Sequence, residues 1–173
     1  MTRLDVFIQR MQAQRECIDW VAAEMRTHPG PVLELGLGNG RTYDHLRDRF
    51  PGRMIFVFDR EVAAHPDCIP PANCLRPGDF RTSVSAYLTE GQPQASFIHA
   101  DIGSANRQAS TRLAADLAPT LVRILAPGGY LACDQPVSVE ELQRIALPGS
   151  PDDDRYHLYR RKNCAWAQPV GWL

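Results

Sequence analysis

The chain has 173 residues, of which 44% are hydrophobic and 23% are charged, an ordinary globular composition that excludes a disordered chain and a fibrous repeat. This length fits one compact domain over residues 1–173. With 19 basic and 20 acidic residues, the formal net charge of −1 provides no overall positive field, so we expect no nucleic-acid partner.

The sequence shows neither a secretory signal nor a membrane span. Residues 1–12 mix charged and apolar side chains, whereas a signal peptide has a basic start followed by an unbroken apolar stretch. The cysteines are odd in number and no two have the C-x-x-C spacing, so we expect reduced thiols at Cys17, Cys68, Cys74, Cys133 and Cys164. These features predict a cytoplasmic protein with no membrane partner.

The first predicted element is an amphipathic helix. Apolar residues recur every three or four positions from Leu4 to Met25, the spacing of one helical stripe. Thr2, with Asp5 three residues later, is suited to cap its start. The prolines within residues 28–31 end it, because proline lacks the amide proton of the helical ladder.

Short apolar runs then alternate with helical stretches, the pattern of parallel strands joined by crossover helices. A helix is predicted over 41–50, and another over 105–125 that is kinked or split at Pro119. Strands are predicted at residues 32–35, 54–58, 73–76, 95–99 and 129–133. The expected fold is a doubly wound, Rossmann-like three-layer α/β sandwich with a mostly parallel sheet.

The C-terminal part is predicted to add a short helix and an antiparallel hairpin. Ser138 and Glu141 form a capping-box pattern, which predicts a helix that runs to Ala146. Residues 155–161 alternate as a strand does, and 164–168 are placed to return beside them. This hairpin is expected at the edge of the sheet.

The most specific local pattern is a glycine-rich turn between the first strand and the following helix. Gly36, Gly38 and Gly40 alternate with other residues directly after the strand. Glycine permits left-handed backbone angles and leaves main-chain amides open to a ligand. The pattern taken alone also fits an ordinary strand-to-helix turn, but its position favours a cofactor site.

The spacing distinguishes between two cofactor classes. Dinucleotide-binding turns need a glycine at the sixth position, and counting from Gly36 that position is Arg41. The segment instead resembles motif I of the class I S-adenosylmethionine-dependent methyltransferases, in which an acidic residue, here Glu34, precedes three alternate glycines. The resemblance implies that this turn lies against the methionine part of the cofactor. It assigns cofactor contacts to Glu34, Leu35, Gly36, Gly38, Asn39 and Gly40.

Two further motifs agree with the resemblance. Asp59, followed by Arg60, ends the second strand, where the family uses a carboxylate to bind the ribose hydroxyls; NAD-binding folds use the same device. Gly78, Asp79 and Phe80 resemble the motif in which a carboxylate meets the adenine amino group and an apolar residue covers the ring. The alternative for Asp79 is an ordinary cap of the next helix.

Candidate catalytic residues follow the fourth strand. Ligands of open parallel sheets lie beyond the carboxyl ends of the strands, which directs attention to His99, Ala100 and Asp101. Asp101 is expected near the reacting methyl group. His99 is either a general base or a hydrogen-bonded residue inside the sheet. Asp101 with Asp134 and Gln135 is similar to a magnesium site of catechol-type O-methyltransferases, but the glutamine replaces an asparagine, and we expect no metal.

Together the motifs resemble the methyltransferase family over roughly residues 32–134. The resemblance implies an enzyme that transfers the methyl group of S-adenosylmethionine directly to an unidentified, small-molecule acceptor. Residues 1–29 are expected to form a helical lid on a core of residues 30–173, and a homo-oligomer is one way to complete the acceptor pocket. The alternatives are a NAD-dependent oxidoreductase and a non-catalytic module that binds S-adenosylmethionine.

Overall fold

A computed structural model describes residues 1–146 and 156–163. The helices are α1 (Arg3–Glu24), α2 (Arg41–Arg49), the 3-10 turn η1 (Pro66–Cys68), α3 (Phe80–Thr89) and α4 (Arg107–Ile124). The strands are β1 (Val32–Leu35), β2 (Ile55–Asp59), β3 (Leu75–Pro77), β4 (Ala95–Ala100), β5 (Leu125–Cys133), β6 (Leu142–Ile145) and β7 (His157–Arg161).

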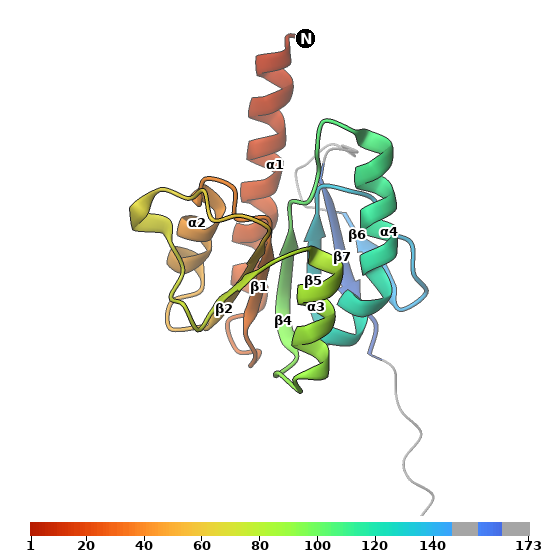
Figure 1. Ribbon diagram of the computed structural model, residues 1–173. Coiled ribbons are helices and arrows are strands. Elements are labelled where there is room, and N and C mark those ends of the chain that lie inside the picture. The colour runs from red at the N-terminus through yellow and green to blue at the C-terminus, as the bar shows by residue number, and fades with distance from the viewer. Residues whose placement is uncertain (147–155, 164–173) are drawn as a thin grey trace, which may run out of the picture.

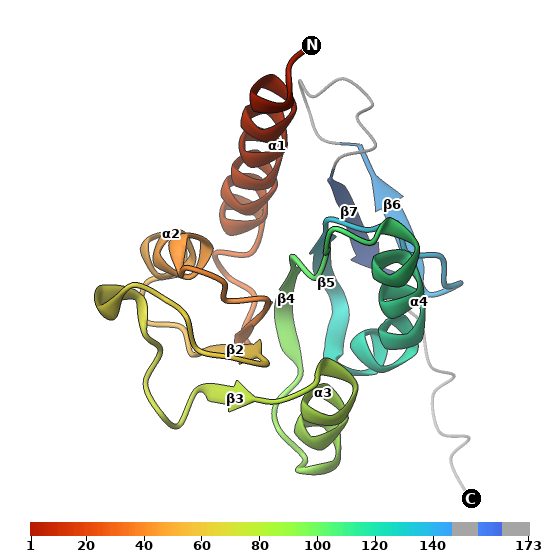
Figure 2. The same ribbon diagram turned by 45° about the horizontal axis from the view of Figure 1, so that its top comes forward.

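The strands form one seven-stranded sheet in the order β3-β2-β1-β4-β5-β7-β6 (Figures 1 and 2). The five strands from β3 to β5 are parallel, and β7 pairs antiparallel with both β5 and β6. The order reverses between β1 and β4, which is the topological switch point where open α/β sheets bind ligands. The predicted fold class is confirmed.

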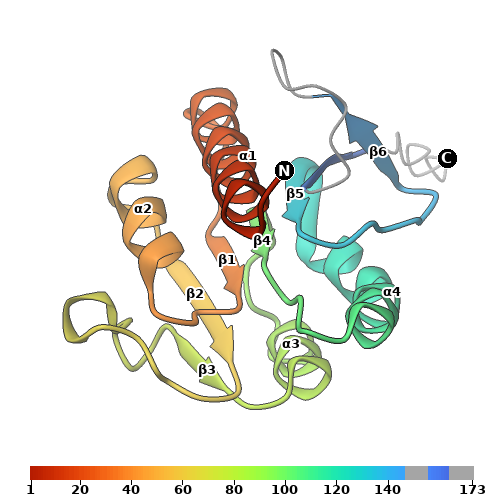
Figure 3. The ribbon, with the colours of Figure 1, turned by 90° about the horizontal axis from the view of Figure 1, so that it is seen from above.

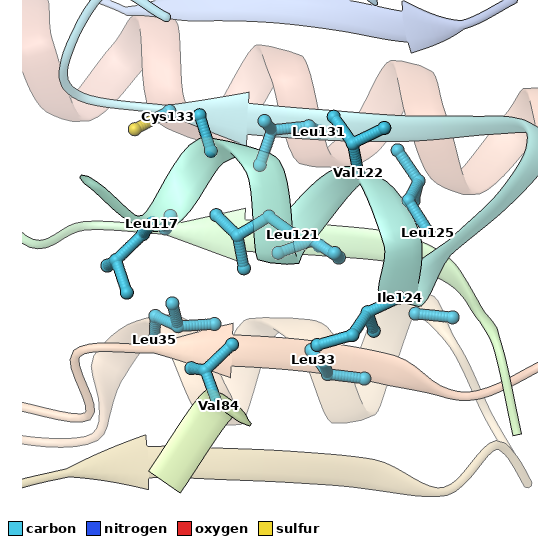
Figure 4. Close-up of a cluster of buried hydrophobic side chains, with 14 of the residues drawn as sticks. Leu33, Leu35, Val84, Leu117, Leu121, Val122, Ile124, Leu125, Leu131 and Cys133 are labelled. Atoms are coloured by element: carbon cyan, nitrogen blue, oxygen red, sulfur yellow. The ribbon is translucent and has the colours of Figure 1, made fainter. Parts of the chain in front are cut away.

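Helices cover both faces of the sheet, as the view from above shows (Figure 3). Alternate side chains of each strand point to opposite faces, so two hydrophobic clusters form. The cluster beneath α1 and α2 includes Val32 and Val57, and the cluster beneath α3 and α4 includes Leu33 and Leu35. Figure 4 shows Leu117 and other side chains of α4 packed over β1 and β5. Full burial of such a side chain contributes about 1.5–3 kcal/mol.

α1 begins as the sequence predicts, with a capping box in which the Thr2 and Asp5 side chains each accept a backbone hydrogen bond of the other residue. Its second half packs on the sheet through Ala13, Cys17 and Val21, among others. Its first half projects beyond the edge at which the parallel strands end (Figure 1). Within α1, residues 3–12 bury no side chain.

The predicted helix over residues 138–146 is wrong. Leu142–Ile145 is instead the strand β6, which pairs with β7 in the register Leu142↔Arg161. A local capping pattern stabilises a helix by about 1 kcal/mol, whereas β7 offers a complete row of backbone partners and burial for Leu142. The other half of the predicted hairpin, residues 164–168, lies outside the described residues.

The helix with Pro119 is not split: α4 is one helix from Arg107 to Ile124. Pro119 is exposed, so the carbonyl group that loses its helical partner lies on the solvent side. β5 begins at Leu125, four residues before its predicted start at Gly129, with a register irregularity opposite Ala95–Phe97.

The cysteines within the described residues are free thiols, with Cys17, Cys74 and Cys133 buried and Cys68 half-buried. Burial raises the pKa of the Cys17 thiol to about 12. Across the described part of the chain, none of the helices combines the length and hydropathy that crossing a bilayer demands.

Candidate functional site

The glycine-rich turn links the end of β1 to α2. Glycine is suited to positions 36 and 38 for different structural reasons. Gly36 has φ +97°, and a Cβ atom on it would lie 2.2 Å from the backbone oxygen of Asp101. Gly36 therefore allows the ends of β1 and β4 to approach each other. Gly38 has φ +50°, and a Cβ there would meet nothing within 4 Å, so the turn has open space on that side.

Asp59, at the end of β2, lies directly beside this turn. Its Oδ2 accepts a hydrogen bond from the Gly38 amide at 3.0 Å, and its Oδ1 accepts one from the Glu61 amide at 3.3 Å. The carboxylate is half-buried, whereas Arg60 is exposed. The structure thus brings together the turn and the carboxylate that the sequence predicts as two parts of one cofactor site.

The end of β3 lies beside the end of β2, because the Gly78 amide donates a hydrogen bond to the Asp59 backbone oxygen at 2.9 Å. Asp79 is the N-cap of α3, and its Oδ1 accepts a hydrogen bond from the Arg81 amide at 2.9 Å. The alternative role of Asp79 as a helix cap is therefore confirmed. Phe80 is 8% exposed and packs in the core beneath α3 and α4. Contacts of Asp79 and Phe80 with adenine stay predictions.

Glu34 lies near the end of β1, the strand between β2 and β4, and its side chain is fully buried. Neither carboxylate oxygen has a hydrogen-bond partner. Burial raises the pKa of Glu34 well above its ordinary value of 4.5, and the negative charges of Asp101 and Asp59 raise it further. A buried polar group without a partner is costly, so this carboxyl is a strong mark of a site that a polar ligand completes.

Asp101 directly follows β4, after the fully buried Ala100. Its amide donates to the Leu35 backbone oxygen at 2.9 Å, which continues the pairing of β4 with β1. Its carboxylate accepts hydrogen bonds from Nη1 of Arg10 at 3.0 and 3.2 Å. Arg10 lies on α1, so the helix reaches the strand ends through this ion pair.

His99 is fully buried on the face of the sheet beneath α1, and in the strand register it lies opposite Glu34. Its Nε2 is hydrogen-bonded to the Tyr156 hydroxyl and, at 3.0 Å, to the Gln14 amide nitrogen, while its Nδ1 has no partner. Burial lowers the pKa of His99 to about 4. These contacts agree with the alternative of a hydrogen-bonded residue inside the sheet; a catalytic role for His99 stays a prediction.

Gln14 connects this buried group to the start of α2, since its amide nitrogen also donates to Thr42 Oγ1 at 3.2 Å. A cavity of about 230 Å³ opens between the two helices above this contact. Its lining consists of Met11, Gln14, Arg15, Ile18, Arg41, Thr42 and His45. Asn39, in the turn before α2, is exposed and accepts a bond from the Arg41 amide at 3.4 Å.

Asp134 follows β5 and is held by two contacts of its own. Its Oδ1 accepts from the Ile102 amide at 3.1 Å, and its Oδ2 accepts from Nε2 of Gln135 at 3.0 Å. Burial raises the pKa of Asp134, and the charge of Asp101 adds to the effect. Within residues 1–146 and 156–163, no group of three or more His, Cys, Asp or Glu side chains is arranged to hold a metal ion.

Sequence reasoning did not find Arg10, Gln14 and Tyr156. Arg10 and Gln14 are four residues apart, so one face of the predicted helix carries both, and this was the available signal. Tyr156 had no local signal, because its contact with His99 joins residues 57 positions apart.

The arrangement has the chemistry of a small polar ligand site at the switch point. A turn with open space at Gly38, a carboxylate beside it and a buried carboxyl with no partner suit a ligand with hydroxyl and ammonium groups. The neutral imidazole of His99, near the end of β4, and Asp101, directly after β4, lie at the same end of the sheet.

Comparison with known proteins identifies the family of the chain. The family described as S-adenosyl-L-methionine methyltransferase matches residues 1–161. The crystal structure of an S-adenosyl-L-methionine methyl transferase from Silicibacter pomeroyi DSS-3 is 43% identical in sequence, has a TM-score of 0.88 and covers 93% of this chain and 99% of that chain. No curated protein sequence matches.

More distant structures share the fold. Human methyltransferase-like protein 13, solved in complex with SAH, is 14% identical with a TM-score of 0.56, and 93% of this chain and 82% of that chain are covered. The plantazolicin methyltransferase BpumL, solved with SAH and a desmethylPZN analog, is 10% identical with a TM-score of 0.58, covering 89% and 84%. The chain itself belongs to the family of S-adenosyl-L-methionine methyltransferases.

Proposed function

We propose that this protein is an enzyme that transfers the methyl group of S-adenosylmethionine to a small-molecule acceptor by direct displacement. The observation that carries the proposal is the hydrogen bond between the Gly38 amide and Asp59, which joins the glycine-rich turn to the carboxylate after β2. When bound, S-adenosylmethionine would supply a methyl group on a positively charged sulfur. The nucleophile of the acceptor takes the methyl group, and the sulfur leaves as a neutral thioether.

The residues present fit this cofactor. Open space beside Gly38 leaves room for a ligand at the turn, and Asp59 is placed to accept hydrogen bonds from ribose hydroxyls. Glu34 has two carboxylate oxygens without partners, which a ligand ammonium group would satisfy. Leu35, Gly36, Asn39, Gly40, Arg60, Gly78, Asp79, Phe80, Ala100 and Asp101 complete the proposed contacts.

The proposed catalytic group is Asp101, with His99 beside it. Displacement at a sulfonium needs mainly orientation and exclusion of water, which a rigid site supplies. The Arg10 guanidinium holds the Asp101 carboxylate in one position. His99 is neutral near pH 7, because burial lowers its pKa to about 4, and a neutral imidazole is able to accept or donate a hydrogen bond at the acceptor.

The N-terminal segment 1–29 is proposed to act as a lid on the core of residues 30–173. α1 supports this role, because its Arg10 binds Asp101 at the strand ends and its Gln14 is hydrogen-bonded to His99 beneath the helix. The small size of the chain and the plantazolicin methyltransferase among its structural neighbours favour a small molecule as acceptor. A cytoplasmic location is part of the same proposal.

Calorimetry with S-adenosylhomocysteine and with NAD tests the proposal. We expect the wild-type protein to bind S-adenosylhomocysteine and not NAD. Asp59→Ala is expected to weaken this affinity about tenfold to a hundredfold, because it removes hydrogen bonds to a charged group. The matched control is Asp67→Ala, since Asp67 is an exposed aspartate in η1.

Unchanged affinity in Asp59→Ala, or preferential binding of NAD, would overturn the cofactor assignment. Tight binding without methyl transfer to any member of a diverse panel of amines, phenols, thiols and carboxylic acids would favour the non-catalytic binding module. Mass spectrometry of the panel for a 14-Da increase supplies that readout, which is the mass of the added CH₂.

A further inference from the structure

The side chain of Glu34 has no group in place to stabilise a negative charge. It is fully buried, and neither carboxylate oxygen has a hydrogen-bond partner. The residues beside it in the strand register are Val57 on β2 and His99 on β4. Val57 is apolar, and the Nδ1 atom of His99 makes no hydrogen bond to Glu34, because it too is without a partner. Both neighbouring strands therefore leave the carboxyl group unsatisfied.

The charged groups around Glu34 disfavour its ionised form. Asp59, after β2, and Asp101, after β4, act on Glu34 with negative charges. α1 contributes Arg10, whose guanidinium is bound to Asp101 instead. α2 contributes Tyr43, which is neutral at pH 7 because burial raises its pKa. In the part of the chain that the structure describes, no cation is paired with Glu34.

A buried carboxylate without a cation or a hydrogen-bond donor is far more costly than a neutral carboxyl group. Glu34 in the free protein therefore holds a proton in mildly acidic solution. His99, the neighbouring base, does not take this proton, because burial lowers the pKa of His99 to about 4. Protonation removes the charge but still leaves the carboxyl group without hydrogen bonds. A cationic ligand that replaces the proton would supply them.

We propose that Glu34 carries a proton in the free protein and exchanges it for the ammonium group of the bound cofactor, so that binding releases a proton to solvent. The proposal rests on the proposed function, because S-adenosylmethionine and S-adenosylhomocysteine both carry an ammonium group on their aminoacyl end. The O–H bond of the carboxyl group breaks, its electron pair stays on the oxygen, and water or buffer takes the proton. The carboxylate then accepts charge-assisted hydrogen bonds from the ammonium group.

Competition between the proton and the ligand fixes the sign of the pH dependence. Because a proton leaves when the ligand enters, the affinity rises with pH, by up to about tenfold for each pH unit below the pKa of Glu34 in the free protein. Burial places this pKa well above the ordinary 4.5. A ligand without an ammonium group leaves the proton in place. 5′-Methylthioadenosine is such a ligand, since it has the adenosine and thioether groups but no aminoacyl end.

Calorimetry of the full chain in buffers of different ionisation enthalpy counts the protons exchanged on binding. At pH 6 we expect wild type to release about one proton for each S-adenosylhomocysteine bound. Glu34→Gln should bind without release, because its amide has no proton to lose. Glu90→Gln, at the exposed C-cap of α3, is the matched control and should release the proton as wild type does. 5′-Methylthioadenosine should bind wild type without releasing a proton.

Infrared spectroscopy follows the carboxyl group directly, and it decides the case if Glu34→Gln binds too weakly for calorimetry. The spectrum of free wild type at pH 6, minus that of free Glu34→Gln, should contain the C=O band of a protonated carboxyl group. The same band should disappear from the wild-type spectrum when S-adenosylhomocysteine is added.

Binding of S-adenosylhomocysteine without proton release overturns the inference and leaves the proposed function standing. Release that persists in Glu34→Gln, or that 5′-methylthioadenosine also causes, overturns it as well, because another protein group or another part of the ligand is then responsible. Absence of the carboxyl band from free wild type shows an ionised Glu34 and has the same consequence. A wild-type protein that does not bind S-adenosylhomocysteine at all overturns the proposed function, and the inference with it.

Discussion

Nη1 of Arg10, on α1, donates hydrogen bonds to both carboxylate oxygens of Asp101, at 3.0 and 3.2 Å. The two residues are 91 positions apart, and their contact joins the N-terminal helix to the edge where the parallel strands end. Both side chains keep partial exposure, 33% for Arg10 and 24% for Asp101. The contact is therefore better suited to orient α1 and Asp101 than to stabilise the fold.

Arg10→Gln is expected to lower the free energy of unfolding by no more than about 1 kcal/mol, because solvent screens a partly exposed ion pair. Amide hydrogen exchange in residues 3–12 should increase, since an ion pair that joins them to the end of β4 is lost. Urea denaturation and hydrogen-exchange mass spectrometry measure the two effects. Arg3→Gln, an exposed neighbour, should change neither. A loss above about 2 kcal/mol would show that the ion pair supports the fold.

Glu34→Gln is expected to become more stable relative to wild type as pH rises from 5 to 8. The unfolded chain releases the Glu34 proton near the ordinary pKa of 4.5, whereas burial raises the folded pKa well above it. Above pH 4.5, and up to the folded pKa, the native state binds more protons than the unfolded state, so wild-type stability falls as pH rises. Glutamine removes this titration.

Urea denaturation of both proteins at pH 5, 6.5 and 8 measures the difference for Glu34. Glu90→Gln, at the exposed C-cap of α3, is the control and should track wild type. A difference between Glu34→Gln and wild type that stays constant over this range would mean that Glu34 ionises in the folded protein as it does in the unfolded chain.

His99→Gln is expected to flatten the acid side of the stability profile. Burial lowers the pKa of His99 from 6.5 to about 4, so between these values the unfolded chain binds a proton that the native state does not. Wild-type stability therefore falls as pH is lowered from 6.5 toward 4, by up to about 3 kcal/mol from this group. Denaturation curves at pH 4.5, 5.5 and 7 measure the slope. The exposed His28→Gln should keep the wild-type slope, and an equally steep slope in His99→Gln would contradict the prediction.

Gly36→Ala is expected to lose mainly stability, whereas Gly38→Ala is expected to lose mainly affinity for the cofactor. A methyl group on Gly36 would lie 2.2 Å from the Asp101 backbone oxygen, so the ends of β1 and β4 must separate, at a cost of about 3 kcal/mol or more. A methyl group on Gly38 has room, and only the left-handed backbone costs about 1 kcal/mol.

Gly38→Ala should therefore fold and yet bind S-adenosylhomocysteine more weakly, because its methyl group enters the open side of the turn. Thermal unfolding and calorimetry on both variants separate the effects. Equal stability of the two would refute the steric account of Gly36, and full affinity in Gly38→Ala would place the cofactor elsewhere.

Much of the fold was predictable because its signals are local. Apolar periodicity and Thr2 with Asp5 located α1, and short apolar runs located the five parallel strands. The same kind of signal failed at Leu142–Ile145, where a capping pattern favoured a helix but the free edge of β7 provided a strand partner. A pattern within a few residues carries no information about a partner such as Arg161, 19 positions away from Leu142.

The sequence by itself determined the glycine-rich turn, the acidic residues Glu34 and Asp59 and the family to which they belong, because these depend on residue type and spacing along the chain. Only the tertiary structure decided that Glu34 is buried without a partner, that His99 is neutral between Gln14 and Tyr156, and that Arg10 holds Asp101. Burial and long-range hydrogen bonds depend on how distant segments pack, and they set the charge of each group at the site.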